Sequence, residues 1–126
     1  MGKKNNEFRK ITRFTDLVVW QEGHKLVLII YKATNDFPGC EEYGLKSQLR
    51  RAIVSFTSNI AEGFAKRSSK EKNQFYNTAH TSLIEVQNQL LIAKDVGYLS
   101  QSEFMKIADQ TVVCHKLIIG LIRAKR

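Results

Sequence analysis

An apolar stripe with helical spacing runs along residues 48–64 and constrains the fold more than any other feature of the chain. Its members recur three and four residues apart, which places them on one face of an α-helix. They are Leu49, Ile53, Phe56, Ile60 and Phe64. We therefore expect this segment to be a long helix that contributes its apolar face to the core.

A polar line occupies another face of the same expected helix. It consists of Arg51, Ser55, Ser58 and Glu62, with Arg50 and Asn59 beside it. An ordinary surface helix carries scattered Lys and Glu. Two arginines next to small polar side chains instead let a backbone or a ligand approach closely, so this face is a candidate contact surface.

The first expected helix covers residues 17–35, with Thr15 or Asp16 as its N-cap. Pro38 disfavours helix at the preceding residue and Gly39 permits a turn, so the helix ends before them. The second expected helix covers residues 42–65. The apolar set of the first helix is Leu17, Trp20, Val27, Leu28 and Tyr31, widened by Ile29 and Ile30.

Capping sequences mark two further helices, at residues 68–96 and 100–123. Ser68 and Ser100 each begin a capping box, and Gly97 is typical of a helix C-terminus. Short connections favour antiparallel neighbours. The sequence therefore predicts an all-α fold, an antiparallel up-down-up-down four-helix bundle over residues 14–126, preceded by a basic flexible arm at residues 1–13.

Several short motifs in this arrangement resemble a known family. They are Phe37-Pro38, Tyr43-Gly44-Leu45, Gln48-Leu49, RRA at residues 50–52 and SNIAEG at residues 58–63. Residues 14–98 resemble the four-helix-bundle proteins encoded in intervening sequences of bacterial 23S ribosomal RNA genes. The same broad group includes the accessory variability determinant (Avd) of diversity-generating retroelements.

The resemblance implies a ring-shaped homopentamer and two settings. One is a gene within a ribosomal RNA intervening sequence. The other is partnership with a reverse transcriptase, in which the basic surface of the ring helps to hold the template. The resemblance also marks Asn59 and Gly63 as characteristic positions.

The apolar faces are wider than a single bundle core needs, which independently favours a homo-oligomer. Residues 27–30 form an unbroken apolar row, and residues 117–122 are apolar except for Gly120. Ile84, Leu91 and Tyr98 add a second apolar line to the third expected helix. The alternative is a large core with a few exposed isoleucines.

The net charge of +8 is concentrated in three blocks. Residues 1–13 carry five basic groups and one acidic group. Residues 43–72 carry seven basic and two acidic groups, and residues 116–126 carry four basic groups and no acidic one. Blocked charge attracts anions, so nucleic acid is the first expected partner, ahead of a membrane. A pentamer would carry five times +8, about +40. The alternative is a cationic protein without an anionic ligand.

The motif content favours a protein that is not an enzyme and has no cofactor or metal. The sequence lacks a Gly-rich phosphate loop, HExxH, CxxC and GxSxG, and His24, His80 and His115 fall on different expected helices. Cys40 and Cys114 match no metal or redox spacing, which favours a reduced, cytoplasmic protein. The longest apolar run, residues 26–31, is too short to span a membrane.

Adjacent helical residues point about 100° apart, so Arg50 and Arg51 cannot share one role. We expect one of them to pair in a bidentate way with Glu62 or Glu85, and the other to face an anionic ligand or a subunit boundary. The alternative is that both arginines fix helix packing or subunit register. We group Ser55, Asn59, Glu62, Gly63 and Glu85 as a polar motif that sets helix or subunit geometry.

A basic turn supplies the strongest candidates for phosphate contact. It consists of Lys66, Arg67, Lys70 and Lys72. Helix N-termini favour anions, so a phosphate is expected there beside Ser68 and Ser69; the alternative is a solvated turn. Arg123, Lys125 and Arg126 add cations at the C-terminus.

The aromatic residues do not alternate with basic ones as a stacking platform would. Most of them are assigned to the core, and Tyr76 is the candidate for exposure near the basic turn. The sequence therefore predicts a non-enzymatic, oligomeric accessory protein that binds RNA or DNA through phosphates without reading sequence. The alternative is a structural oligomer that docks an acidic protein.

Overall fold

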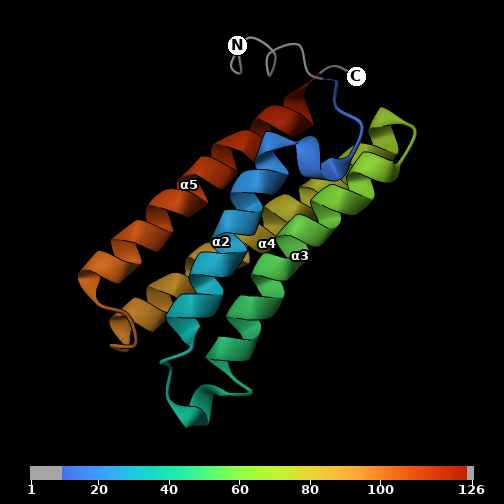
Figure 1. Ribbon diagram of the computed structural model, residues 1–126. Helices are drawn as coiled ribbons and strands as arrows, with labels where there is room; N and C mark the ends of the chain where they lie inside the picture. Colours follow the sequence, from blue (N-terminus) through green and yellow to red (C-terminus); the bar gives the residue numbers. More distant parts are fainter. Residues whose placement is uncertain (1–9, 125–126) are drawn as a thin grey trace.

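The computed structural model describes residues 10–124, and over that range the chain forms helices and no strands (Figure 1). The predicted all-α class is therefore confirmed. The long helices are α2 (Val18–Thr34), α3 (Leu45–Ala65), α4 (Ser69–Asp95) and α5 (Gln101–Arg123). Short 3₁₀ turns, η1 (Phe14–Asp16) and η2 (Gly39–Glu41), precede α2 and α3.

Each long helix packs against two others, so the four form a closed bundle: α2 with α3, α3 with α4, α4 with α5, and α5 with α2. Cross-helix contacts give the directions. Gly23 of α2 lies against Phe56 of α3, whereas Thr34, further along α2, bonds the earlier residue Arg50. Figure 1 shows the same reversal at each connection along the chain.

Helix α2 begins one residue later than expected and with a different cap. Leu17 occupies the N-cap position without a side-chain bond, so neither Thr15 nor Asp16 caps this helix. Asp16 instead accepts hydrogen bonds from the backbone N–H groups of Thr12 and Arg13, both 3.1 Å from Oδ2. The Asp16 carboxylate therefore binds the backbone of the residues that precede η1.

Helix α3 begins at Leu45, three residues after the expected start, because Glu41 caps it from η2. One carboxylate oxygen of Glu41 accepts the Leu45 N–H at 2.9 Å. The other accepts the hydroxyl of Tyr98 at 2.8 Å, which raises the pKa of Tyr98 to about 12. These bonds attach the start of α3 to the α4–α5 connection.

The later boundaries lie within one residue of the predicted ones. Ser68 and Ser100 accept the expected backbone hydrogen bonds at the starts of α4 and α5. The reciprocal bond of a full capping box forms at Ser100, whereas the Glu71 carboxylate accepts the Ser68 hydroxyl instead. Gly97 adopts a φ of 88°, the left-handed conformation expected after a helix end.

The predicted stripe of α3 is buried, and Leu49, Ile53, Phe56 and Ile60 are inaccessible to solvent. The face assigned to the first helix is partly wrong, because Leu28 and Tyr31 are exposed and the buried Leu26 was not assigned to it, whereas Ile30 is buried as expected. The core side of α2 includes Gly23 and Thr34, two residues without large apolar side chains, so the apolar row of residues 27–30 did not reveal it. The buried residues of α2 are Val19, Gly23, Leu26, Ile30 and Thr34.

Apolar side chains remain exposed outside this core. Ile84 and Leu91, predicted to form a second line on α4, are 49% and 47% exposed. Val54 on α3 and Val112 on α5 are also exposed. Within residues 10–124, no helix combines the length and the apolar character that crossing a membrane would need.

Candidate nucleic-acid interface

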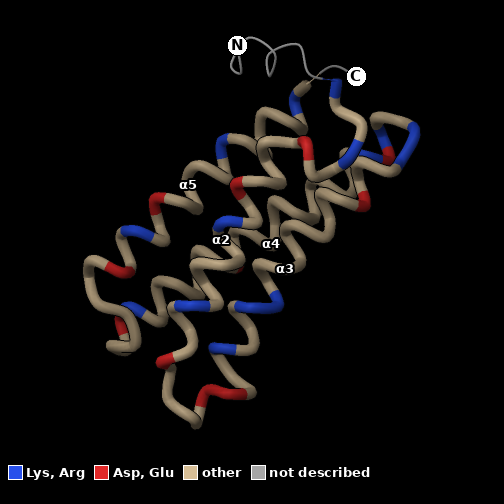
Figure 2. The backbone as a smooth tube through the Cα atoms, viewed as in Figure 1, with Lys and Arg blue, Asp and Glu red and all other residues tan. Residues whose placement is uncertain are grey.

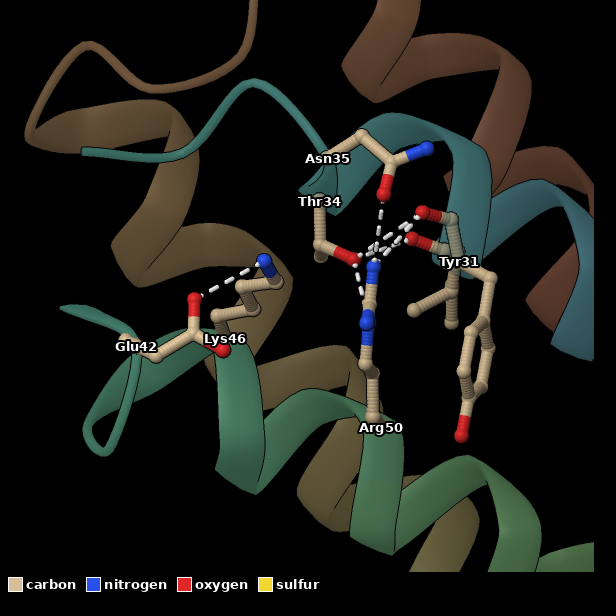
Figure 3. A network of polar contacts seen from close by, with 7 residues as sticks. Tyr31, Thr34, Asn35, Glu42, Lys46 and Arg50 are labelled. Carbon is tan, nitrogen blue, oxygen red and sulfur yellow. Dashed lines mark hydrogen bonds and ion pairs between the residues drawn. The ribbon is translucent and has the colours of Figure 1, made fainter. Parts of the chain in front are cut away.

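The guanidinium of Arg50 holds the end of α2 (Figure 3). Its Nε donates to Thr34 Oγ1 at 2.9 Å, and Nη2 donates to the Tyr31 carbonyl at 3.0 Å and to Asn35 Oδ1 at 3.1 Å. It also lies 4.4 Å from the centroid of the Tyr31 ring. The last carbonyls of a helix lack intrahelical partners, so Arg50 supplies a C-terminal cap from another helix.

Arg51 is exposed and has no hydrogen bond or ion pair with any residue from 10 to 124. The expected bidentate pair with Glu62 or Glu85 is therefore absent: Arg50 pairs with neutral oxygens of α2, and both glutamates are exposed. Arg51 and Glu85 do border one depression of about 330 Å³ between α3 and α4.

The small polar residues of α3 join it to α4. The hydroxyls of Ser55 and Ser82 lie 2.8 Å apart, and Asn59 Nδ2 donates to the carbonyl of Ser55 at 2.8 Å and to its hydroxyl at 3.1 Å. A Cβ on Gly63 would lie 2.6 Å from the ring of Tyr76. Ser55 and Gly63 therefore lie at the contact between α3 and α4 within one chain, and Asn59 bonds Ser55 within α3.

The basic turn contains two kinds of cation. Lys72 Nζ donates to the Phe64 carbonyl at 2.7 Å and so caps α3, while Lys66 lies 5.1 Å from the ring of Phe75. Arg67 and Lys70 are exposed and have no ion pair within the described residues. The turn therefore presents Arg67 and Lys70 to solvent and uses Lys72 for the fold.

Glu71 already serves the N-terminus of α4, where a phosphate was expected. Its backbone N–H donates to Ser68 Oγ at 3.1 Å, and its carboxylate accepts the Ser68 hydroxyl at 3.1 Å. The carboxylate occupies the positive end of the helix. The basic side chains of the turn are therefore better placed for an anion than Ser68 is.

One end of the bundle gathers most of the candidate cations (Figure 2). Asn73 Nδ2 in the first turns of α4 donates to the Ile122 carbonyl near the end of α5 at 3.2 Å, which brings Arg123 to the basic turn. Lys125 and Arg126 lie outside the described residues. By their places beside η1 and at the adjoining ends of α3, α4 and α5, seven described cations and three described carboxylates lie at this end: Lys10, Arg13, Lys66, Arg67, Lys70, Lys72 and Arg123, with Asp16, Glu62 and Glu71.

A second feature escaped the sequence-based prediction, an open groove of about 570 Å³ beside the start of α3. Its lining includes Arg50, Arg51, Tyr43 and Tyr31, the last of which was assigned to the apolar face of the first helix. Tyr43 is 95% exposed and Tyr31 is 39% exposed, whereas Tyr76, expected near the surface, is 1% exposed. The expected helix of residues 42–65 included Tyr43, and the signal available against it was the lack of apolar periodicity before Leu45.

His80 and His115 come together across α4 and α5, with ring centroids 5.0 Å apart. His80 Nε2 and His115 Nδ1 are buried and have no hydrogen-bond partner among the described residues. Desolvation, and then the charge of His115, lower the pKa of His80. Within residues 10–124 no group of three or more His, Cys, Asp and Glu side chains is arranged to hold a metal ion.

Comparison with protein families matches residues 15–120 to the 23S rRNA-intervening sequence protein family. The chain belongs to this family. The match begins at η1 and extends along α5. It confirms the resemblance carried by the motifs of α3 and adds the last helix to it.

A solved structure shares the fold of this 23S rRNA-intervening sequence protein. It is a Bacteroides thetaiotaomicron VPI-5482 protein of unknown function from the S23 ribosomal protein family. The TM-score is 0.76 at 21% identity, over 85% of this chain and 100% of the other. A search of curated proteins gave no match.

Proposed function

We propose that this protein is a non-enzymatic accessory subunit that binds RNA or DNA through phosphate contacts at the basic end of the bundle. The observation that carries the proposal is the convergence of the basic turn, residues 10–13 and the end of α5. Among the described residues, seven cations minus three carboxylates leave +4 at this end. A polyanion would release counterions on binding there without any contact to its bases.

The charge asymmetry between the two ends favours this orientation. The connections at the other end carry Asp36, Glu41, Glu42, Asp95 and Glu103, and Lys46 is paired there with Glu42 at 3.0 Å. Lys32, Lys94 and Lys106 lie beside these carboxylates, so this end is close to neutral and a polyanion is attracted more strongly to the basic end. Arg67 and Lys70 are the cations of the turn that can meet phosphates without giving up a structural bond.

We further propose that the up-down-up-down bundle is the subunit of a ring-shaped homo-oligomer, with five copies as the family resemblance implies. The exposed Ile84 and Leu91 supply apolar surface that a neighbouring subunit would cover. Each subunit would repeat the basic end, so weak phosphate contacts would add up. The same apolar surface also suits the second candidate, a structural oligomer that docks an acidic protein.

The family name supports a ribosomal RNA setting, and the resemblance to Avd supports a reverse transcriptase as partner. The exposed thiol of Cys40 suits a reducing, cytoplasmic compartment. The two settings differ in the nucleic acid but require the same phosphate contacts.

The proposal is tested by the salt dependence of duplex RNA binding. Replacing Arg67 and Lys70 together by Gln should weaken binding and reduce the slope of log K against log salt by about 1.8. The matched control replaces Lys32 and Lys106, which are exposed near the acidic end, and should leave the slope unchanged. Equal effects of the two pairs, or no retention of nucleic acid at physiological salt, would refute the proposal.

A further inference from the structure

The open groove lies away from the basic end and is built by the end of α2, the residues before α3 and the first turns of α3. Three cations, Lys46, Arg50 and Arg51, and one carboxylate, Glu42, line it. Its volume of about 570 Å³ lies in the range of sites that hold small organic groups, roughly 300–1,000 Å³. The groove can therefore take a group that is both flat and anionic.

Tyr43 gives the groove an unused aromatic face. Its side chain is 95% exposed, and no described residue makes a ring contact with it. Tyr31 lies in the same groove but already carries the guanidinium of Arg50 over its ring. A tyrosine in this situation contributes almost nothing to folding, whereas a planar ligand could stack on it.

The polar wall next to Tyr43 suits a phosphate. Arg51 has no partner within residues 10–124, and Nη1 of Arg50 keeps its two donors after Nε and Nη2 have bonded α2. Ser47 and Ser58 add hydroxyls to the lining. Lys46 is held by Glu42 at 3.0 Å, so the arginines are the available cations.

The depression that holds Glu85 shares Arg51 and Ser55 with the groove, so a surface track continues from Tyr43 across α3 towards α4. An extended strand can follow such a track. At the basic end, Phe64 of α3 and Phe75 of α4 lie under Lys72 and Lys66. Phe14 of η1 makes an edge contact with Trp20 and is 38% exposed, against 95% for Tyr43. The two surfaces therefore differ in the part of a nucleic acid that each can contact.

We propose that the groove binds an unpaired nucleotide of single-stranded nucleic acid, with the base stacked on Tyr43 and the phosphate held by Arg51 and Arg50 Nη1. The proposal rests on the proposed function and deepens it, because it names single-stranded segments as the ligand of this surface. A paired base stays inside the duplex stack and cannot reach Tyr43. The stacking is tolerant of base identity, since every base offers a flat face.

The test compares binding of a labelled single-stranded RNA of about 12 nucleotides with binding of the duplex made from it and its complement. The full-length protein and its Tyr43→Ala, Tyr43→Phe and Arg51→Gln variants are titrated with both. Tyr43→Ala should weaken single-strand binding by about fivefold or more and leave duplex binding unchanged. Tyr43→Phe keeps the flat ring and should bind like the original protein.

Arg51→Gln should weaken single-strand binding more than duplex binding, while the Arg67 and Lys70 variant should weaken both. Normal duplex binding with no effect of Tyr43→Ala on the single strand would overturn the groove proposal and leave the proposed function standing. Failure of the original protein to bind either RNA would refute both the groove proposal and the proposed function. A change of oligomeric mass in Tyr43→Ala would assign the groove to a subunit contact and also overturn the proposal.

Discussion

Arg50 and Thr34 join α3 to the last turn of α2 through a 2.9 Å hydrogen bond from Nε to Oγ1. Thr34 is 1% exposed and donates its own hydroxyl to the Ile30 carbonyl at 2.8 Å, so Arg50 satisfies the remaining acceptor of a buried group. The neighbouring Arg51 makes no such bond within residues 10–124. One helical step therefore separates a structural arginine from an arginine available to a ligand.

This difference predicts that two matched substitutions change the stability by different amounts. Arg50→Gln should lower the free energy of unfolding by roughly 1–3 kcal/mol, because buried and terminal acceptors lose charged donors. Arg51→Gln should change it by less than about 0.5 kcal/mol. Urea denaturation of both variants measures the two values, and a larger loss for Arg51→Gln would contradict the assignment.

The core stripe of α3 gives a second matched pair, at adjacent positions. Ile53 is inaccessible to solvent, so Ile53→Asp would bury a carboxylate without a partner, at a cost comparable with the roughly 5–15 kcal/mol that stabilises a domain. Val54 is 39% exposed, and Val54→Asp should remain folded. Circular dichroism separates the two outcomes. A folded Ile53→Asp variant would mean that another face of α3 is buried.

Gly63→Ala should destabilise the protein although alanine favours helix by about 1 kcal/mol. The new methyl group would lie 2.6 Å from the ring of Tyr76, which is buried and cannot move aside. Overpacking of this kind costs about 1–3 kcal/mol. Gly120→Ala on α5 is the control, since a Cβ there meets no described atom within 4 Å. The melting temperature of Gly120→Ala should lie above that of the original protein, and the melting temperature of Gly63→Ala should lie below it.

Stability should fall as the pH decreases from 7.5 to 5.5, because of His80. Its burial, and then the charge of His115, lower its pKa below the ordinary 6.5. The unfolded chain then binds more protons than the folded one, so the contribution is present above about pH 6.5 and is lost on acidification. Denaturation at several pH values should show a weaker dependence in His80→Gln. An unchanged dependence would exclude His80 as its source.

The two cysteines should differ strongly in reactivity. Cys40 is exposed, whereas burial, and then the charge of Glu22, raise the pKa of the Cys114 thiol to about 12. A thiol reagent at pH 8 should modify Cys40 quickly and Cys114 only after urea is added, because the thiolate is the reactive species. Cys40→Ser should abolish the fast phase. Fast labelling of that variant would show that α5 opens readily.

The helix boundaries in the second half of the chain were predictable because capping is local chemistry. Ser68 and Ser100 bond N–H groups three residues away, and Gly97 adopts a φ that few other residues tolerate. The start of α3 was not predictable, because Glu41 is oriented both by Leu45 and by Tyr98 from a distant connection. The core side of α2 was also missed, since Gly23 and Thr34 are buried by their neighbours on α3 and not by their own hydrophobicity.

By itself the sequence determined the helical class, most helix boundaries, the buried stripe of α3 and the family. All of these depend on residue spacing along one helix or on motifs within about a turn. The tertiary structure alone decided which cations remain available, because Arg50 and Lys72 are used by backbone carbonyls of other segments. It also decided that Tyr43 is exposed beside Arg51. Such pairings depend on which helix faces meet in space, and a one-dimensional pattern does not contain them.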